Sequence, residues 1–174
     1  LGDDYMLHMS LQAEGMAGLF SPSCNKMSID WSDKARQQER GFMFENRYTT
    51  LTYHEAEGST DHLNEGSEKI DEKIEETIDW VSFKNQFFSF SIFGRCDFEK
   101  TKLSSKMETQ GSGYIKDYSA EMSTKFDPAG KEPTQLFFYF GPNHYKTLTA
   151  LDKGRDEKWE LNRLVYLAGR SSAG

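Results

Sequence analysis

The residue types that perform most enzyme chemistry are present in this chain, but not at the spacings that the chemistry requires. A nucleophilic site needs a serine or cysteine beside a histidine and an acid. Ser112 lies in a Gly-Ser-Gly turn without the strand-to-helix pattern of a nucleophile elbow, and neither Cys24 nor Cys96 lies in a recognisable motif. The histidines include no pair four residues apart and no HExxH motif; they are His8, His54, His62 and His144. The sequence therefore predicts no catalytic residue and no metal ligand.

Sites built on carboxylate pairs, phosphate-binding loops or paired cysteines are not indicated either. Asp97 and Glu99 could flank a glycosidic bond only if the fold gave them a suitable separation. The chain has neither a GxGxxG nor a GxxxxGK[ST] motif, so we expect no nucleotide cofactor. Cys24 and Cys96 share no short spacing with each other or with a histidine. We expect two buried free thiols, and their separation in the sequence leaves a disulfide open.

The charge of the chain is acidic and concentrated in one segment. Its 174 residues carry 28 acidic and 21 basic side chains, a net charge of -7, which argues against binding to nucleic acid. Residues 65–79 contain seven acids against two lysines, and hence -5 of that charge. We predict an exposed acidic patch, Glu72, Glu75 and Glu76, that a basic partner could bind. The alternative is a solvated connector without a binding role.

The elements that would position these groups are organised around the apolar run at residues 136–140. Alternate side chains of this run would face opposite sides of a sheet, so both sides need covering and a central strand is expected. The Gly-Pro pair at 141–142 should end the strand, because proline has no N–H to donate. Apolar residues then recur every three positions, which predicts a helix ending near Gly154; they are Tyr145, Leu148 and Leu151.

Alternation of apolar and polar residues predicts most of the other elements. Strands are expected at 5–13, 27–32, 42–54, 98–107 and 114–126, and a final strand should bury Trp159, Leu161, Val165 and Leu167. Between Trp80 and Gly94 the apolar residues change parity within 84–87, which requires a bulge or a break. Turns are expected at 111–113 and 127–130. About nine strands with little helix predict a mostly β protein, a two-sheet antiparallel sandwich with one or two short helices.

Length and hydropathy indicate one domain of a longer protein. We assign residues 1–168 to a single domain and 169–174 to a tail that could derive from cloning. The chain starts at Leu1 and not at a methionine, which suggests a fragment. Its apolar runs are only a few residues long, so neither a transmembrane helix nor a signal peptide is expected within it.

Two motifs resemble one known family. They are Trp80-Val81-Ser82-Phe83-Lys84-Asn85-Gln86-Phe87-Phe88 and, some fifty residues later, Phe138-Tyr139-Phe140-Gly141-Pro142-Asn143-His144-Tyr145. In this order they resemble the large periplasmic domain of the YidC-type membrane protein insertases of Gram-negative bacteria. The segment 159–167 is similar to the part of that family that leads toward its second membrane span. We take ten residues as a family signature with a mainly structural role: Trp80, Phe83, Lys84, Phe87, Phe88, Tyr139, Phe140, Gly141, Pro142 and Tyr145.

This resemblance implies a β-supersandwich of the galactose-mutarotase-like kind, inserted between the first two transmembrane segments of a bacterial inner-membrane protein. It implies a non-catalytic periplasmic domain that helps an insertase to insert and fold membrane proteins, alone or with the Sec translocon. The partners would be Sec translocon components and nascent membrane proteins, and membrane contact would run only through transmembrane segments outside this chain. No cofactor and no catalytic residue is carried over from the family.

Two questions remain open at this level. The spacing of Ile70, Ile74, Ile78 and Val81 taken alone favours an amphipathic helix, whereas the resemblance implies a strand over 75–83. We adopt the strand, because this segment is rich in strand-forming residues. The alternative function is that of a carbohydrate-binding or aldose-epimerase-like sandwich protein, because one fold can host several functions. An epimerase would need a histidine and a carboxylate that converge in a cleft.

Overall fold

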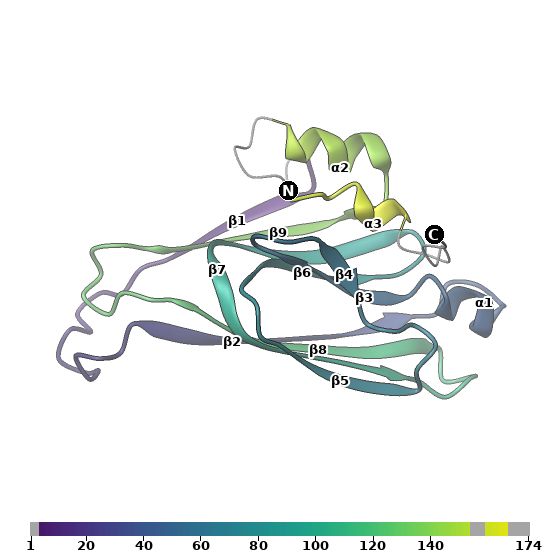
Figure 1. Cartoon of the computed structure of the whole chain (residues 1–174), viewed down its shortest axis with the longest axis horizontal. Helices are drawn as coiled ribbons and strands as arrows, with labels where there is room; N and C mark the ends of the chain where they lie inside the picture. The colour runs from purple at the N-terminus through teal and green to yellow at the C-terminus, as the bar shows by residue number, and fades with distance from the viewer. Residues whose placement is uncertain (1–3, 154–158, 167–174) are drawn as a thin grey trace.

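One long strand, β7, connects two layers of β-sheet. The structure is a computed structural model that describes residues 4–153 and 159–166. β7 spans Phe88–Met107 and is antiparallel to all of its neighbours. Its first half pairs with β6 and β9, and its second half pairs with β5 and β8. The first half therefore belongs to the upper layer in Figure 1 and the second half to the lower layer.

The described residues form nine strands and three short helices. The upper layer has the order β1-β9-β7-β6-β3-β4, while β8 lies between β2 and β7 in the lower layer and β5 lies on the other side of β7. The strands are β1 (Met6–Leu11), β2 (Lys26–Arg36), β3 (Thr50–Glu55), β4 (Thr60–His62), β5 (Lys69–Ile74), β6 (Ile78–Lys84), β7, β8 (Tyr114–Lys125) and β9 (Thr134–Pro142). The helices are α1 (Phe42–Asn46), α2 (Tyr145–Asp152) and α3 (Arg163–Tyr166), of which α2 and α3 cover the outer face of the upper layer. The predicted mostly β, antiparallel architecture is confirmed.

A glycine allows β7 to change layers. A Cβ at Gly94 would lie 2.3 Å from the carbonyl oxygen of Cys96 and 3.1 Å from the ring of Phe98, so a larger residue does not fit. Lys100 has a φ of 51°, and the pairing with β8 shifts register between Glu99 and Lys102. The strand thus bends over residues 94–100. The strand predicted at 98–107 is the second half of this longer one.

The main hydrophobic core lies between the two layers, and a second cluster lies between the upper layer and the helices. β9 contributes to both, since Leu136 and Phe138 face the main core while Phe137 and Tyr139 face the second cluster. β9 also pairs with β1 on one side and β7 on the other, which confirms the predicted central strand. Contrary to prediction, the strand includes the Gly-Pro pair at 141–142. A proline at the last residue of a strand removes no hydrogen bond from the interior of the ladder.

The helical spacing at residues 70–81 does not form a helix. β5 ends at Ile74 and β6 begins at Ile78, and both of these isoleucines, together with Val81, are buried in the main core. The spacing of four residues arises because two strands on either side of a short connection each direct an isoleucine inward. The strand predicted over 75–83 is confirmed from residue 78 onward, and 75–77 form the connection. The predicted break in the alternation of apolar residues at 84–87 corresponds to the turn between β6 and β7.

Two other segments also differ from the sequence prediction. The strand predicted over 42–54 begins with helix α1, and only its second part forms β3. Buried Glu45 holds this helix against the preceding chain, because its carboxylate accepts the backbone N–H groups of Gln38 and Glu39 at 2.9–3.0 Å. The strand predicted over 27–32 continues to Arg36, so part of the charged run at 34–40 pairs with β8.

The final strand is not formed within the described residues. Residues 159–162 are irregular and lead into α3, while Leu167 lies outside the described residues. Trp159 and Leu161 are buried as predicted, and Val165 is half-buried. Leu164 is buried as well, because the spacing of three from Leu161 places both on the same side of the chain as α3 begins.

The two cysteines are not buried as expected. Cys24 is half-buried and Cys96 is exposed, so the two free thiols are not core residues. None of the helices in the described ranges is long and apolar enough to cross a membrane.

Candidate functional site

The two signature motifs meet at one corner of the upper layer. The backbone N–H of Asn143 donates to the carbonyl of Phe87 at 2.7 Å, and its side-chain amide donates to the carbonyl of Asn85 at 2.8 Å. The side-chain oxygen of Asn85 accepts the backbone N–H groups of Phe87 and Phe88, both at 2.8 Å, which closes the β6–β7 turn. The turn and the β9–α2 junction are therefore one hydrogen-bonded unit. The signature omitted both asparagines, although asparagine after a strand is a turn signal.

The ten signature residues divide by exposure. Five are buried, namely Trp80, Phe83, Lys84, Tyr139 and Gly141, and two are half-buried, Phe140 and Pro142. Phe87, Phe88 and Tyr145 are 42–46% exposed. The first seven therefore shape the interior, whereas the last three present aromatic rings to the surface beside the corner.

Contacts of the buried signature residues hold the layers together. Phe83 stacks between Trp31 of β2 and Tyr118 of β8, with ring centroids 4.4 and 5.1 Å away. The hydroxyl of Tyr139 donates to the carbonyl of Pro142 at 2.6 Å. A Cβ at Gly141 would lie 2.6 Å from the Tyr139 ring, so this bond needs glycine at 141. These contacts make Phe83, Tyr139 and Gly141 part of the packing of the fold.

Lys84 is a buried cation. It is 2% exposed, and burial lowers its pKa to about 8. Within the described ranges its ammonium group forms no hydrogen bond and no ion pair. It extends from the outer face of the upper layer between Thr50 of β3 and Ser89 of β7, its register partners on either side. Thr50 is also buried, and its hydroxyl has no hydrogen-bond partner among the described residues.

A histidine and a carboxylate meet below the C-terminal segment. The Nδ1 atom of His54 on β3 lies 2.8 Å from a carboxylate oxygen of Asp79 on β6, and its Nε2 atom lies 3.8 Å from Glu160. Both His54 and Asp79 are about 5% exposed at the side chain. Burial alone would lower the pKa of His54, but the hydrogen bond and charge of Asp79, with the charges of Glu160 and Asp152, outweigh it and raise the pKa.

The contacts of this pair connect strands β3 and β6 to the C-terminal segment. They indicate a structural role and not a catalytic one. The imidazole stacks on Trp80 with centroids 5.9 Å apart, and the Trp80 indole donates to the carbonyl of Trp159 at 2.8 Å. Glu160 accepts a hydrogen bond from Thr60 of β4 at 3.1 Å. Both nitrogens of His54 thus face carboxylates of the fold itself. No spacing in the sequence connects these residues, because they lie on separate elements.

The predicted acidic patch is exposed. Glu72 lies on β5, while Glu75 and Glu76 lie in the connection to β6. None of the three forms an ion pair with a described residue. β5 is an edge strand of the lower layer, and charged side chains on an edge oppose pairing with other chains. Edge protection is thus the structural reason for charge at this position.

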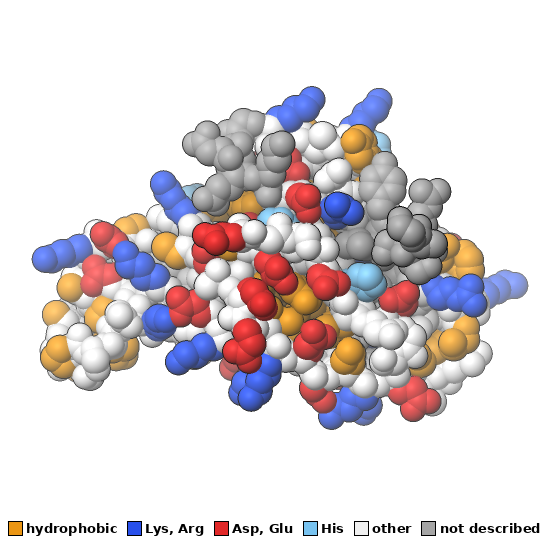
Figure 2. Space-filling view, in the orientation of Figure 1, with side chains coloured by type: hydrophobic (Ala, Val, Ile, Leu, Met, Phe, Trp, Pro, Cys, Tyr) orange, Lys and Arg blue, Asp and Glu red, His pale blue; other side chains and the backbone are white. Residues whose placement is uncertain are grey.

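Two acids from the upper layer extend the patch. The pKa of buried Tyr53 is raised, first by burial and then by the charges of Asp61, Glu72, Glu55 and Glu76, so these carboxylates lie near enough to act on one phenol. Glu55 belongs to β3 and Asp61 to β4, the edge strand of the upper layer. Acidic side chains accordingly gather on the face that β3, β4 and β5 present in Figure 2. We call Glu55, Asp61 and the patch together the acidic edge.

The remaining candidates do not form a reactive site. Glu99 makes an ion pair with Lys26 of β2, and Asp97 is exposed, so the pair at 97 and 99 is not directed into a shared cleft. Within 4–153 and 159–166, no group of three or more histidines, cysteines and acids could hold a metal ion. Ser112 lies in an exposed turn between β7 and β8.

Comparison with known proteins relates the whole fold to one family. Residues 1–167 match the family model described as the YidC periplasmic domain. A relative from Bacteroides fragilis, named membrane protein insertase YidC, is 58% identical over 166 residues, 95% of this chain and 26% of its own length. Relatives of the same name from Phocaeicola vulgatus and Parabacteroides distasonis are 48% and 37% identical, over 96% and 95% of the chain and 27% and 26% of their own lengths. The chain thus spans about a quarter of the length of these relatives.

Proposed function

Because the chain belongs to the family of YidC periplasmic domains, we propose that it is the accessory module through which an inner-membrane insertase engages its partners in the periplasm. The family is not a family of enzymes, and its members are periplasmic domains of inner-membrane insertases. On this proposal the domain assists the insertion and folding of inner-membrane proteins, alone or with the Sec translocon, and performs no chemistry itself.

The observation that carries the proposal is the family match over residues 1–167. The match includes both signature motifs, and the structure joins them in one hydrogen-bonded unit. We propose that their ten residues are mainly structural, since seven of them shape the interior. We also propose that residues 1–168 fold as one domain and that 169–174 are a tail.

The finer description of the fold belongs to the same proposal. Two layers that share the long strand β7 and enclose one main core fit a β-supersandwich of the galactose-mutarotase-like kind. That fold class also contains sugar-binding proteins, but family membership favours the insertase function here.

The proposed partners are Sec translocon components and nascent membrane proteins. The acidic patch, Glu72, Glu75 and Glu76, supports a contact with a basic partner, because its carboxylates are exposed and have no ion-pair partner among the described residues. The acidic edge around Tyr53 enlarges this surface with Glu55 and Asp61.

The test uses the full-length insertase as the only copy in its host. One strain carries the intact protein, and a second carries a protein from which residues 4–166 are removed. An accessory module predicts that insertion continues at a reduced rate in the second strain and that less Sec translocon co-purifies with the insertase. Unchanged insertion and unchanged co-purification would contradict the proposal, as would complete loss of insertion of every substrate tested.

A further inference from the structure

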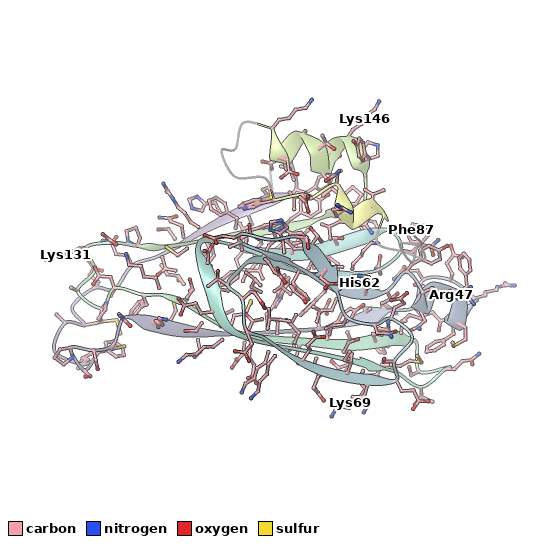
Figure 3. All side chains as sticks on the ribbon, in the orientation of Figure 1. Arg47, His62, Lys69, Phe87, Lys131 and Lys146 are labelled. Carbon is pink, nitrogen blue, oxygen red and sulfur yellow. The ribbon has the colours of Figure 1, made fainter. Side chains whose placement is uncertain are left out.

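Half of the exposed large apolar side chains of the described residues lie at one end of the long axis. These five lie on α1, on the β6–β7 turn and at the start of α2; they are Met43, Phe44, Phe87, Phe88 and Tyr145, each 42–57% exposed. We call this group the aromatic end. Figure 3 places Phe87 and Arg47 toward the same end of the molecule and Lys131 at the opposite end.

Contacts within the structure connect these residues. Tyr145 follows Asn143 by two positions, and Asn143 is bonded to the carbonyl of Phe87. Phe88 and Gln38 line one cavity between the layers. Gln38 is bonded in turn through its backbone N–H to Glu45 of α1 at 2.9 Å. The three segments therefore form one continuous end of the fold.

Several polar backbone groups of the β6–β7 turn already have hydrogen-bond partners within the protein, which favours a poorly hydrated environment. In the β6–β7 turn, the N–H groups of Phe87 and Phe88 and the carbonyls of Asn85 and Phe87 all have partners within the protein. A polar group without such a partner would be costly to move out of water. The rings of Phe87 and Phe88 consequently project from a turn in which these four backbone groups are paired, while the buried side-chain oxygen of Gln86 has no hydrogen-bond partner among the described residues.

The charge at this end is opposite to that of the molecule as a whole. Residues 33–47, 85–88 and 143–146 expose five cations, Lys34, Arg36, Arg40, Arg47 and Lys146, against two exposed carboxylates, Asp33 and Glu39. Of these cations, only Lys34 forms an ion pair with a described residue. The nearby carboxylate of Glu108 is already paired with Lys34 at 3.0 Å. The whole chain carries -7, so a negatively charged surface would attract this end and repel the acidic edge.

We propose that the aromatic end docks on the surface of an anionic lipid bilayer. Half-exposed aromatic rings with adjacent cations are the side chains that favour the interface between lipid headgroups and acyl chains. Family membership places the domain next to a membrane, so this ligand is available to every copy. The contact orients the domain with its aromatic end toward the lipid. It adds to any attachment through transmembrane segments and does not depend on the proposed function.

The test uses the 174-residue chain and vesicles with bromine-labelled acyl chains, which quench tryptophan fluorescence at short range. Phe87→Trp places a reporter at the aromatic end, and Phe20→Trp places a matched reporter in the β1–β2 connection, where Phe20 is 38% exposed. With vesicles of phosphatidylglycerol and phosphatidylethanolamine, the reporter at 87 should be quenched and the reporter at 20 should not. Equal quenching of both reporters, or none at 87, would overturn the proposal.

Two sets of variants separate apolar and charge contributions. Phe87→Ser with Phe88→Ser should weaken partitioning to these vesicles by about tenfold, whereas Leu19→Ser with Phe20→Ser should leave it unchanged.

Arg47→Glu with Lys146→Glu should abolish the preference for anionic over phosphatidylcholine vesicles, and Lys131→Glu should preserve it. Thermal melts confirm that each variant is folded. If folded Phe87 and Phe88 variants bound vesicles as the parent chain does, or lost only contact with a protein of the insertase complex, the lipid proposal would be wrong.

Discussion

Lys84 shows how the environment of one residue can limit stability. Burial holds its pKa at about 8, so keeping the ammonium charged at neutral pH costs on the order of 3 kcal/mol. We expect Lys84→Met to raise the free energy of unfolding at pH 7, because it removes a buried charge that has no partner among the described residues. Urea unfolding at pH 7 measures the change. A loss of more than about 1 kcal/mol would show that the ammonium has a role that these contacts do not reveal.

Lys116 is the matched control for this variant. Burial also lowers its pKa to about 8, but its ammonium donates to the carbonyls of Thr49 and Glu65 at 2.7 and 2.9 Å. Lys116→Met should therefore destabilise the fold, since two acceptors lose their donor. For both lysines the folded pKa lies below the ordinary 10.5, so the unfolded chain binds more protons between pH 8 and 10.5. The free energy of unfolding should therefore rise with pH from about pH 8 upward. The rise should be less steep in either methionine variant than in the parent chain.

His54 gives a pH dependence of the opposite sign. Its folded pKa is raised above 6.5, so its charged pair with Asp79 stabilises the fold fully below pH 6.5, and this contribution is lost as the pH rises through the folded pKa. His54→Gln should lower the free energy of unfolding by about 1–3 kcal/mol at pH 6 and by less at pH 8. His144→Gln, at an exposed position, is the control. An effect of His54→Gln that does not change with pH would mean that the charged pair contributes nothing.

At the scale of elements, the segment 159–166 acts as a clamp on the upper layer. Trp159 stacks on Phe93 with centroids 4.4 Å apart, and Leu161 and Leu164 are completely buried. Trp159→Ala should reduce the free energy of unfolding by about 3–5 kcal/mol through the cavity that it leaves, and Val165→Ala, half-buried, by much less. Differential scanning calorimetry measures both. Melting temperatures for the two variants within a degree or two of the parent would identify the segment as a loosely attached linker.

The edge strand β5 and its connection to β6 provide the proposed contact for a basic partner. Charge reversal of Glu72, Glu75 and Glu76 to lysine should weaken co-purification of the full-length insertase with Sec components. Added salt should weaken it too, since exposed charges are screened beyond about 10 Å at roughly 0.1 M salt. The same reversal at Glu14, Asp30 and Glu132, exposed positions outside the acidic edge, is the control. Binding that ignores both salt and the reversal would rule out the acidic patch as the contact.

At the scale of the whole molecule, two layers share one core, and the charge is distributed unevenly around them. The acidic edge lies along β3, β4 and β5, whereas exposed cations predominate at the aromatic end. This distribution suits a domain that is oriented relative to a surface and binds partners laterally.

The whole molecule should show no turnover of sugars. The purified chain, incubated with aldoses, should leave their anomeric equilibration at the uncatalysed rate when it is followed by polarimetry. Both nitrogens of His54 face carboxylates of the fold, and Asp79 is buried with it, so this pair is not available as an acid and a base for a substrate. Catalysis that disappears in His54→Gln or Asp79→Asn would contradict both this expectation and the non-catalytic function.

The amino-acid sequence by itself determined the strand content and most of the turns. The alternation along 114–126 and the apolar run at 136–140 are patterns of neighbouring side chains, so they can be recognised in the sequence alone. Turn residues also act over short distances along the chain. At 127–130, for example, Asp127 accepts the backbone N–H groups of Ala129, Lys131 and Glu132. The two signature motifs likewise indicated the family without any coordinates.

Only the tertiary structure decided what depends on contacts between distant segments. Spacing alone could not distinguish a helix at 70–81 from two strands that each bury an isoleucine, because β7 supplies the pairing for both strands. The contact of His54 with Asp79 needs β3 to pair with β6, and the acidic edge needs β4 and β5 to lie at the same side of two layers. The aromatic end has the same origin, since hydrogen bonds between separate turns, and not proximity along the chain, bring Phe87 and Tyr145 together.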